Sequence, residues 1–273
     1  MLRMESTQKI NSRDNTRIKN ARAVRDGREA GQIFIEGWRL ADEALSSSLV
    51  IKDIYIAEAS TRDERVRIFK ERIGVRNLEP VEISGSIAQS LSDTRSPQGI
   101  FIIAERPRSG RDAIENSFGH LSGGRVVVFL DRINNPSNLG AIVRTAEAAG
   151  AAGILVSPGS ADPFSPKGLR ASMGSAFRLP IVEGCDFREA KQWAGEHGAI
   201  ASGAVIDGRA TSYTEIDWNK KRLLMFGSEA HGIDKDAWCE LDELIRIPMA
   251  RGVESLNLAV ACGVMLFEAK RHN

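Results

Sequence analysis

The feature that most constrains the fold is a run of apolar residues, RVVVFLD at 125–131, that leads directly into a helical pattern. A strand that is apolar on both faces is typical of a parallel sheet covered by helices. Strand and helix patterns then alternate to the end of the chain. Strands are expected at 153–157, 198–205, 222–227 and 244–248, and helices at 139–149, 164–176, 187–197 and 254–270. Residues 125–273 are therefore predicted to form an α/β domain with a parallel sheet, whose sites lie at the carboxyl ends of the strands.

The part of the chain before this domain has two sections. Up to residue 105, apolar runs alternate with helical patterns, which predicts a smaller α/β domain. Residues 106–124 are polar and rich in Gly and Ser, and we interpret them as a linker with one short helix. Residues 1–30 carry an excess of basic side chains, which either meet phosphate groups or form the solvated face of an amphipathic helix.

Composition excludes several classes of protein. Hydrophobic residues make up 42% of the chain, but no apolar run reaches the ~18 residues that a membrane span requires. The start lacks the apolar stretch of a signal peptide, so a cytoplasmic protein is expected. The four His and three Cys lack the spacing of a zinc site, so no metal is predicted. Sequence motifs for dinucleotide binding, for a P-loop and for an α/β-hydrolase are also missing.

The first motif, NPSNLGAIVRTAEAAG at 135–150, follows the apolar strand at 125–131. Pro136 restricts the residue before it to extended geometry, and Asn138 is expected to be the N-cap of the following helix. The alternative to a ligand site is a capped helix packed closely on its sheet, with Arg144 extending to solvent. A Pro–Asn–Gly loop at the carboxyl end of a strand favours the ligand site.

Two further motifs follow later strands. In LMFGSEAHG at 224–232, Glu229 lies between two glycines and could orient a hydroxyl or amide group, although the acidic first turn of a helix would look similar. In RIPMARGVESLNLAVACGVMLFEAK at 246–270, Ser255 is expected to be an N-cap and Asn257 opens a buried helix. A polar residue at the mouth of such a helix either holds a neighbouring loop or takes part in catalysis.

Taken in this order, the three motifs resemble those of the SpoU-type RNA 2′-O-ribose methyltransferases of the SPOUT superfamily. The resemblance spans residues 126–268. The earlier segments IFIEGWRLADEAL at 33–45 and SPQGIFIIAE at 96–105 are similar to a substrate-binding domain that is like ribosomal protein L30e. Members that act on large-subunit ribosomal RNA carry this domain, including the thiostrepton-resistance type.

The resemblance implies a catalytic domain with a deep trefoil knot, which is rare among proteins. It also implies S-adenosylmethionine as the cofactor, RNA rather than DNA as the substrate, and a homodimer whose active site draws on both subunits. Arg144 would activate the ribose hydroxyl, and Asn138 would shape the loop around it. The other polar residues that match functional positions are Glu229, Ser255 and Asn257. The residues that match cofactor-lining positions are Gly227, Ile247, Met249 and Leu256.

The expected function is S-adenosylmethionine-dependent 2′-O-ribose methylation of RNA, with 23S ribosomal RNA as the first choice of substrate. Two alternatives stay open: a transfer-RNA 2′-O-methyltransferase, and a non-catalytic ribosomal-RNA-binding protein with the same fold. The intact polar positions favour an enzyme. Arginine is a poor base, so Arg144 either is strongly perturbed or grips the phosphate beside the target ribose and stabilises the developing alkoxide.

Overall fold

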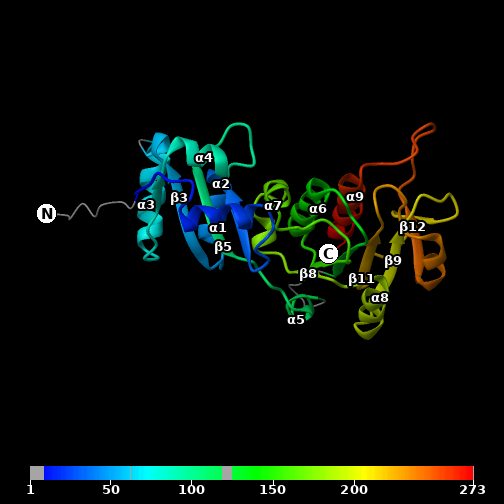
Figure 1. The fold of residues 1–273 in the computed structure, drawn as a ribbon. Helices are drawn as coiled ribbons and strands as arrows, with labels where there is room; N and C mark the ends of the chain where they lie inside the picture. Colours follow the sequence, from blue (N-terminus) through cyan, green and yellow to red (C-terminus); the bar gives the residue numbers. More distant parts are fainter. Residues whose placement is uncertain (1–8, 62, 119–124, 273) are drawn as a thin grey trace. The chain divides into compact units, whose positions relative to one another are not determined.

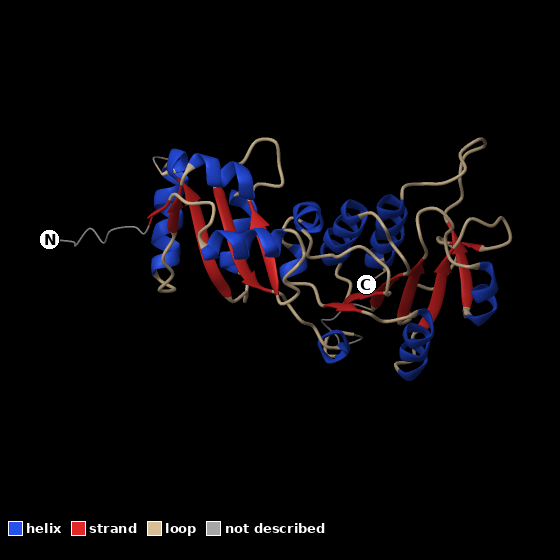
Figure 2. Ribbon diagram, in the orientation of Figure 1, coloured by secondary structure: helices blue, strands red, loops and turns tan. Residues whose placement is uncertain are grey.

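The computed structural model describes residues 9–61, 63–118 and 125–272. The chain divides into two compact units, each with its own sheet (Figures 1 and 2). The first unit comprises residues 1–107 and 164–177, and the second comprises residues 108–163 and 178–273. Residues 164–177 thus group with the first unit, although they lie inside the segment predicted as one C-terminal domain. Part of the basic segment, residues 1–8, and part of the expected linker, residues 119–124, lie outside the described residues.

The first unit is built on a five-stranded mixed sheet in the order β1-β4-β3-β5-β2. β4 is parallel to β1 and β3, whereas β5 is antiparallel to β3 and β2. The strands are β1 Lys9–Ile10, β2 Gln32–Glu36, β3 Ile51–Ala57, β4 Val81–Ile83 and β5 Ile100–Glu105. The helices are α1 Thr16–Arg25, α2 Trp38–Ser46, α3 Glu64–Gly74, α4 Gly85–Leu91 and α7 Pro166–Ser172, with 3-10 turns at Glu58–Ser60 and Ser175–Phe177.

Arginines of the basic segment hold the first unit together. Arg22 donates a hydrogen bond to Oγ of Ser90 at 2.9 Å, and Arg25 donates to the carbonyl oxygen of Ser90 at 2.6 Å. Ser90 lies in the last turn of α4, where backbone carbonyls lack helical partners, so the contact from Arg25 satisfies the end of that helix. α1 is therefore an amphipathic helix whose arginines are used within the unit, rather than a row of free cations.

The second unit is built on a seven-stranded sheet in the order β10-β12-β9-β11-β6-β7-β8, and every strand pair is parallel. The strands are β6 Val126–Leu130, β7 Gly153–Val156, β8 Ile181–Glu183, β9 Ile200–Ala204, β10 Thr211–Ser212, β11 Arg222–Phe226 and β12 Glu243–Arg246. The helices are α5 Arg111–Glu115, α6 Pro136–Ala149, α8 Phe187–Glu196 and α9 Leu258–Arg271, with a 3-10 helix at Lys235–Glu240. Helices α6 and α9 cover one face of the sheet and α8 the other (Figure 2). The prediction of an α/β fold with a parallel sheet is confirmed.

Several element boundaries differ from those predicted. α6 begins at Pro136 with Asn135 as its N-cap, so the prediction that Asn138 is the cap is wrong. α9 begins at Leu258 with Asn257 as its N-cap, so the same role predicted for Ser255 is also wrong. The helix expected at 164–176 is shorter, and β8 and β10 are unpredicted strands of three and two residues. No helix among the described residues is both long and apolar enough to cross a membrane.

Arg222 is a buried charged residue in this sheet, beside the buried Ser202 of β9. Its side chain is 1% exposed and pairs with Glu243 of β12, and its guanidinium carbon lies 5.1 Å from the centre of the Trp218 ring. Burial lowers the pKa of this guanidinium to about 10. Because the pair joins β11 to β12 across β9, it fixes the strand that leads into the third sequence motif.

Candidate active site

Three segments that carry the sequence motifs leave the carboxyl ends of strands in the second unit. β6 leads into α6, β11 leads into the loop at 227–234, and β12 leads into the loop at 247–257 before α9. β6 and β11 are neighbours, with Leu130 opposite Phe226 at their last positions, and β9 lies between β11 and β12. Because all these strands are parallel, the three segments start from the same edge of the sheet.

Glu229, in the loop after β11, holds the loop after β6. Its Oε2 accepts a hydrogen bond from the backbone N of Asn134 at 3.2 Å. Its Oε1 accepts from the backbone N of Asn135 at 3.3 Å and from Nδ2 of Asn138 at 3.1 Å. Partial burial raises the pKa of this carboxyl, but the hydrogen bonds from Asn138 and the backbone outweigh it, so the pKa lies below its usual value. Glu229 is therefore ionised and acts as a clamp, that is, a side chain that holds the loop of the first motif to the loop of the second.

Asn257 joins the third motif to the first. Its Nδ2 donates a hydrogen bond to Oδ1 of Asn138 at 3.1 Å, while its Oδ1 accepts from the backbone N of Ala259 at 2.9 Å. One side chain thus caps α9 and contacts α6. Asn138 uses both ends of its amide for contacts with distant residues, which explains why Asn135 caps α6 instead.

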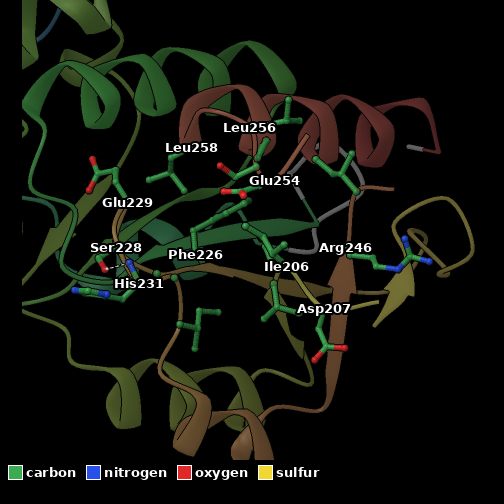
Figure 3. A pocket seen from close by; sticks show the side chains of 18 of the residues that line it. Ile206, Asp207, Phe226, Ser228, Glu229, His231, Arg246, Glu254, Leu256 and Leu258 are labelled. Carbon is green, nitrogen blue, oxygen red and sulfur yellow. Dashed lines mark hydrogen bonds between the residues drawn. The ribbon is translucent and has the colours of Figure 1, made fainter. Parts of the chain in front are cut away.

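A cavity of about 850 Å³ is lined by this polar cluster and by the ends of β9, β11 and β12 (Figure 3). Small-molecule sites typically occupy roughly 300–1,000 Å³. The lining includes eight of the nine residues predicted for the site: Asn138, Gly227, Glu229, Ile247, Met249, Ser255, Leu256 and Asn257. Among the described residues, no group of three or more His, Cys, Asp or Glu side chains is placed to hold a metal ion.

Gly227 is required by the packing of its own loop. A Cβ at this position would lie 2.0 Å from the carbonyl carbon of Gly232, a separation that no side chain can adopt. Gly232 itself has a φ of 67°, in the left-handed region that favours glycine, and its N donates to the carbonyl oxygen of Ser228 at 2.8 Å. The two glycines therefore allow the tight turn that presents Glu229.

Comparison with known proteins identifies the family. Residues 125–267 match the model of the SpoU rRNA Methylase family, and this match covers more than half of the chain. The chain belongs to the SpoU rRNA methylase family. Residues 15–102 also match the model of the MRM3-like substrate binding domain. The resemblance predicted from the three motifs is confirmed.

Three similar proteins match this chain over nearly its whole length. The AdoMet-bound rRNA methyltransferase from Sinorhizobium meliloti superposes with a TM-score of 0.82 and 31% identity, covering 97% of this chain and 98% of that one. The SpoU methyltransferase AviRb from Streptomyces viridochromogenes, solved in complex with AdoMet, gives a TM-score of 0.81 and 26% identity, covering 94% of this chain and 97% of that one. RlmP of Bacillus subtilis, a 23S rRNA (guanosine(2553)-2′-O)-methyltransferase, is 27% identical over 96% of this chain and 98% of its own length.

Arg144 is the predicted site residue that does not line the cavity of this SpoU family member. It is exposed on α6, and no hydrogen bond or ion pair joins its side chain to another residue in the described part of the chain. At ~100° per residue, six positions place it about 240° around the helix from Asn138. Asn138 and Thr145 mark the α6 face that meets α9, where a Cβ at Gly263 would lie 3.3 Å from Cγ2 of Thr145, so Arg144 lies about a third of a turn away from that face.

One wall of the cavity is not predicted from the sequence. Ile206 and Asp207, in the loop after β9, line it, as does Arg246 at the end of β12 (Figure 3). Hydrogen bonds from the side chain and the backbone of Arg209 lower the pKa of Asp207. The sequence predicts the strand β9, and sites in such sheets lie at the carboxyl ends of strands. The position of the loop after β9 was therefore the signal that could have placed it in the predicted site.

Proposed function

We propose that this protein transfers a methyl group from S-adenosylmethionine to a ribose 2′-hydroxyl of RNA, and that its substrate is large-subunit ribosomal RNA. The proposal rests on the cluster of Glu229, Asn138 and Asn257, which joins the three motif segments of a SpoU family member beside the cavity. The substrate is supported by the match to a substrate binding domain at residues 15–102 and by the 23S rRNA methyltransferase named above.

The cavity fits S-adenosylmethionine in size and in chemistry. Apolar side chains such as Phe226 and Leu256 suit a flat adenine ring, while the carboxylates of Glu229 and Glu254 suit a cationic ligand. We assign the contacts with the cofactor to Gly227, Ile247, Met249 and Leu256, largely through backbone atoms. When bound, the cofactor supplies an electrophilic methyl group.

Methyl transfer to a 2′-hydroxyl is an in-line displacement, in which an oxygen–carbon bond forms, the carbon–sulfur bond breaks to leave a neutral thioether, and the hydroxyl proton passes to solvent water. A guanidinium group is a poor acceptor for that proton. We therefore assign Arg144 to the phosphate beside the target ribose and to the negative charge that develops on the oxygen. Asn138 and Glu229 hold the loop that faces the ribose, and Ser255 contributes a hydroxyl at the rim of the cavity.

A homodimer would complete this site. α9 exposes Val260 and Phe267, which are 51% and 50% accessible and lie two turns apart on one face of the helix. Arg144 lies on the neighbouring helix α6, outside the cavity of its own chain. We propose that a second copy of the chain covers this face, and that the Arg144 side chain of one copy serves the cavity of the other.

The resemblance also supports two finer proposals about the fold. We propose, on the resemblance, that the second unit contains a deep trefoil knot. In its sheet β12 lies beyond β9 from β11, and α9 then packs on α6. We further propose that the domain at residues 15–102 has the fold of ribosomal protein L30e and selects the RNA.

Single-turnover methylation of 23S ribosomal RNA with labelled cofactor tests the function. The wild-type protein is expected to methylate one 2′-hydroxyl. Arg144→Ala should leave folding and cofactor affinity unchanged and lower the rate by ~100-fold, and Arg144→Lys should restore it poorly because an ammonium group lacks the planar fork. Methyl transfer to tRNA instead would support a transfer-RNA 2′-O-methyltransferase. Cofactor binding without transfer to any RNA would support a non-catalytic protein that binds ribosomal RNA.

Mixing two inactive variants tests the shared site. Arg144→Ala lacks the cation, and Leu256→Glu places a charge in the cavity. If Arg144 acts on the partner's cavity, each mixed dimer has one intact site out of two, and random mixing should restore about a quarter of wild-type activity. If Arg144 serves its own cavity, the mixture should stay inactive.

A further inference from the structure

The loop between α4 and β5, residues 92–98, is fixed at its start by a buried carboxylate. Glu36, the last residue of β2, is only 6% exposed. It accepts hydrogen bonds from Oγ of Ser92 at 2.5 Å, from the backbone N of Asp93 at 3.0 Å and from Oγ1 of Thr94 at 3.1 Å. Burying a carboxylate costs free energy unless hydrogen bonds compensate it, so this arrangement commits Glu36 to the loop.

The other end of the loop is fixed by the start of α2. Oε1 of Gln98 accepts a hydrogen bond from the backbone N of Trp38 at 3.1 Å, and the Gln98 carbonyl oxygen accepts from Nε1 of Trp38 at 3.0 Å. Gly37 has a φ of 101°, and a Cβ there would lie 3.3 Å from Oε1 of Gln98. Both ends of the loop are therefore held by the segment at 36–38.

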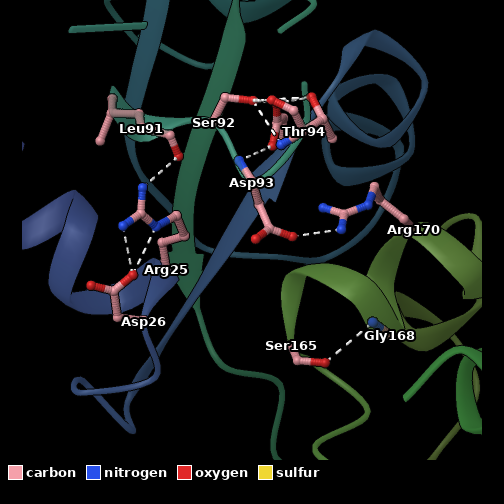
Figure 4. A network of polar contacts seen from close by, with 10 residues as sticks. Arg25, Asp26, Leu91, Ser92, Asp93, Thr94, Ser165, Gly168 and Arg170 are labelled. Carbon is pink, nitrogen blue, oxygen red and sulfur yellow. Dashed lines mark hydrogen bonds and ion pairs between the residues drawn. The ribbon is translucent and has the colours of Figure 1, made fainter. Parts of the chain in front are cut away.

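A third contact comes from α7. Arg170 donates a hydrogen bond to Oδ2 of Asp93 at 2.6 Å, and Ser92, Asp93 and Thr94 gather beside this ion pair (Figure 4). α7 belongs to the same compact unit as the loop, although it comes from much later in the sequence. The one acidic side chain of the loop is thus neutralised within the unit.

Arg95 and Ser96, between these fixed ends, are exposed. Within the described residues, no hydrogen bond or ion pair is recorded for the Arg95 side chain. The arginines of α1 differ, because Arg22 and Arg25 bond to α4. The loop therefore presents an uncommitted guanidinium on a backbone that is held at both ends.

We propose that the loop at 92–98 is a contact surface for the substrate RNA, in which Arg95 binds a backbone phosphate and Glu36 positions the loop. The inference rests on the proposed function, since it names the part of the first unit that meets the RNA. A guanidinium pairs well with phosphate, and most such contacts position the nucleic acid rather than read its bases. A loop that is ordered beforehand loses less conformational entropy on binding.

Binding of a protein-free 23S rRNA transcript, measured by filter retention over a range of salt concentrations, tests the role of Arg95. Arg95→Ala should weaken binding about five- to tenfold and lower the slope of log affinity against log salt by about 0.7 to 0.9, the value for one lost phosphate contact. Lys19→Ala is the matched control, because Lys19 is an exposed cation of the same unit and its one ion pair among the described residues is with Asp14 at 3.2 Å. Its affinity and slope should equal those of the wild type.

A double-mutant cycle tests the positioning role of Glu36. Glu36→Gln should weaken RNA binding by itself, raise KM for RNA and leave kcat at saturating RNA unchanged. In the Arg95→Ala background the same change should have little further effect, because both residues act through one contact. Ser92→Ala removes one hydrogen bond to Glu36 together with the bonds that Oγ of Ser92 makes to Thr94, so it should give an effect of the same kind and serves if Glu36→Gln does not fold.

Equal affinities and slopes for Arg95→Ala and wild type would overturn the proposal, and so would an effect seen with ribosomal particles but not with protein-free RNA. The latter result would assign Arg95 to a protein partner. The methylation assay separates this failure from failure of the proposed function. Methylation at subsaturating RNA that is equal for wild type and Arg95→Ala would overturn only the inference, whereas RNA binding without any methylation would overturn only the function.

Discussion

Two glutamates, one in each unit, hold loops in a similar way. Glu36 accepts hydrogen bonds from the segment at 92–94, and Glu229 accepts hydrogen bonds from the segment at 134–138. Both carboxylates accept backbone amides, and both act on residues that are distant in sequence. Each one converts a loop at the end of an element into a fixed surface.

Their surroundings differ. Glu36 is buried, and its partners are two hydroxyl groups and one amide of a single loop. Glu229 is exposed and lines the cavity, and its partner Asn138 is bonded in turn to Asn257 of the third motif. A buried clamp contributes mainly to the stability and shape of its loop. A clamp that faces a cavity can also act on a ligand, so substitutions of the two should separate stability from activity.

Of the two glutamates, Glu229 should have the larger effect on activity, tested by Glu229→Gln. Glutamine keeps the size of the side chain and one acceptor oxygen, but its NH2 group stands where Oε2 accepts from Asn134 and its charge is lost, so the hold on the loop after β6 should weaken. We expect single-turnover methylation to fall by ~100-fold while the protein stays folded, as for loss of a positioning group in an active site. Glu215→Gln, an exposed change in the same unit, is the control and should keep the wild-type rate. A Glu229→Gln rate within threefold of wild type would remove the clamp from the catalytic machinery.

The largest effect on stability is expected for Glu36→Ala. Its removal leaves the hydroxyl of Thr94 and the amide of Asp93 without this acceptor in a partly buried place, whereas Oγ of Ser92 can still donate to the carbonyl oxygen of Thr94, and unsatisfied groups cost about 1–3 kcal/mol each. Because water can replace some of these bonds, we expect a loss of about 3 kcal/mol in the free energy of unfolding of the first unit. Glu229→Ala should cost about 1 kcal/mol, since its exposed partners can bond to water. Chemical denaturation of both variants provides the measurement, and equal losses would contradict the distinction between the two clamps.

The sequence predicts the parts of this structure that depend on local pattern. The apolar runs at β6, β7, β9, β11 and β12 are sufficient to infer a parallel sheet, because such runs have few other stable locations. The three motifs follow the strands that bring them to one edge. β10 has only two residues, which is too short for an alternation of apolar and polar residues to be recognised, so the sequence does not predict it.

Contacts between distant residues account for the parts that could not be predicted. Asn135 and Asn138 are equally good N-caps by type, and the choice between them depends on Glu229, which lies 91 residues after Asn138. The grouping of α7 with the first unit depends on contacts such as that of Arg170 with Asp93, 77 residues apart. No local pattern encodes these pairings.

The smallest expected effect is the pH dependence of the Glu229 clamp. Its pKa in the folded protein is lowered, because hydrogen bonds from Asn138 and the backbone outweigh the effect of burial. A lowered folded-state pKa means that the contribution to stability is complete above the usual glutamate value of about 4.3, and is lost only as the pH falls through the lower folded value. The carboxyl carbon signal of Glu229, identified in NMR spectra by its absence in Glu229→Gln, should therefore titrate below that usual value. The amide signals of Asn134 and Asn135 should shift over the same pH range, because their hydrogen bonds weaken when the carboxylate is protonated. Titration at or above the usual value would show that Glu229 does not hold these amides in solution, and the two clamps would then differ in kind and not only in exposure.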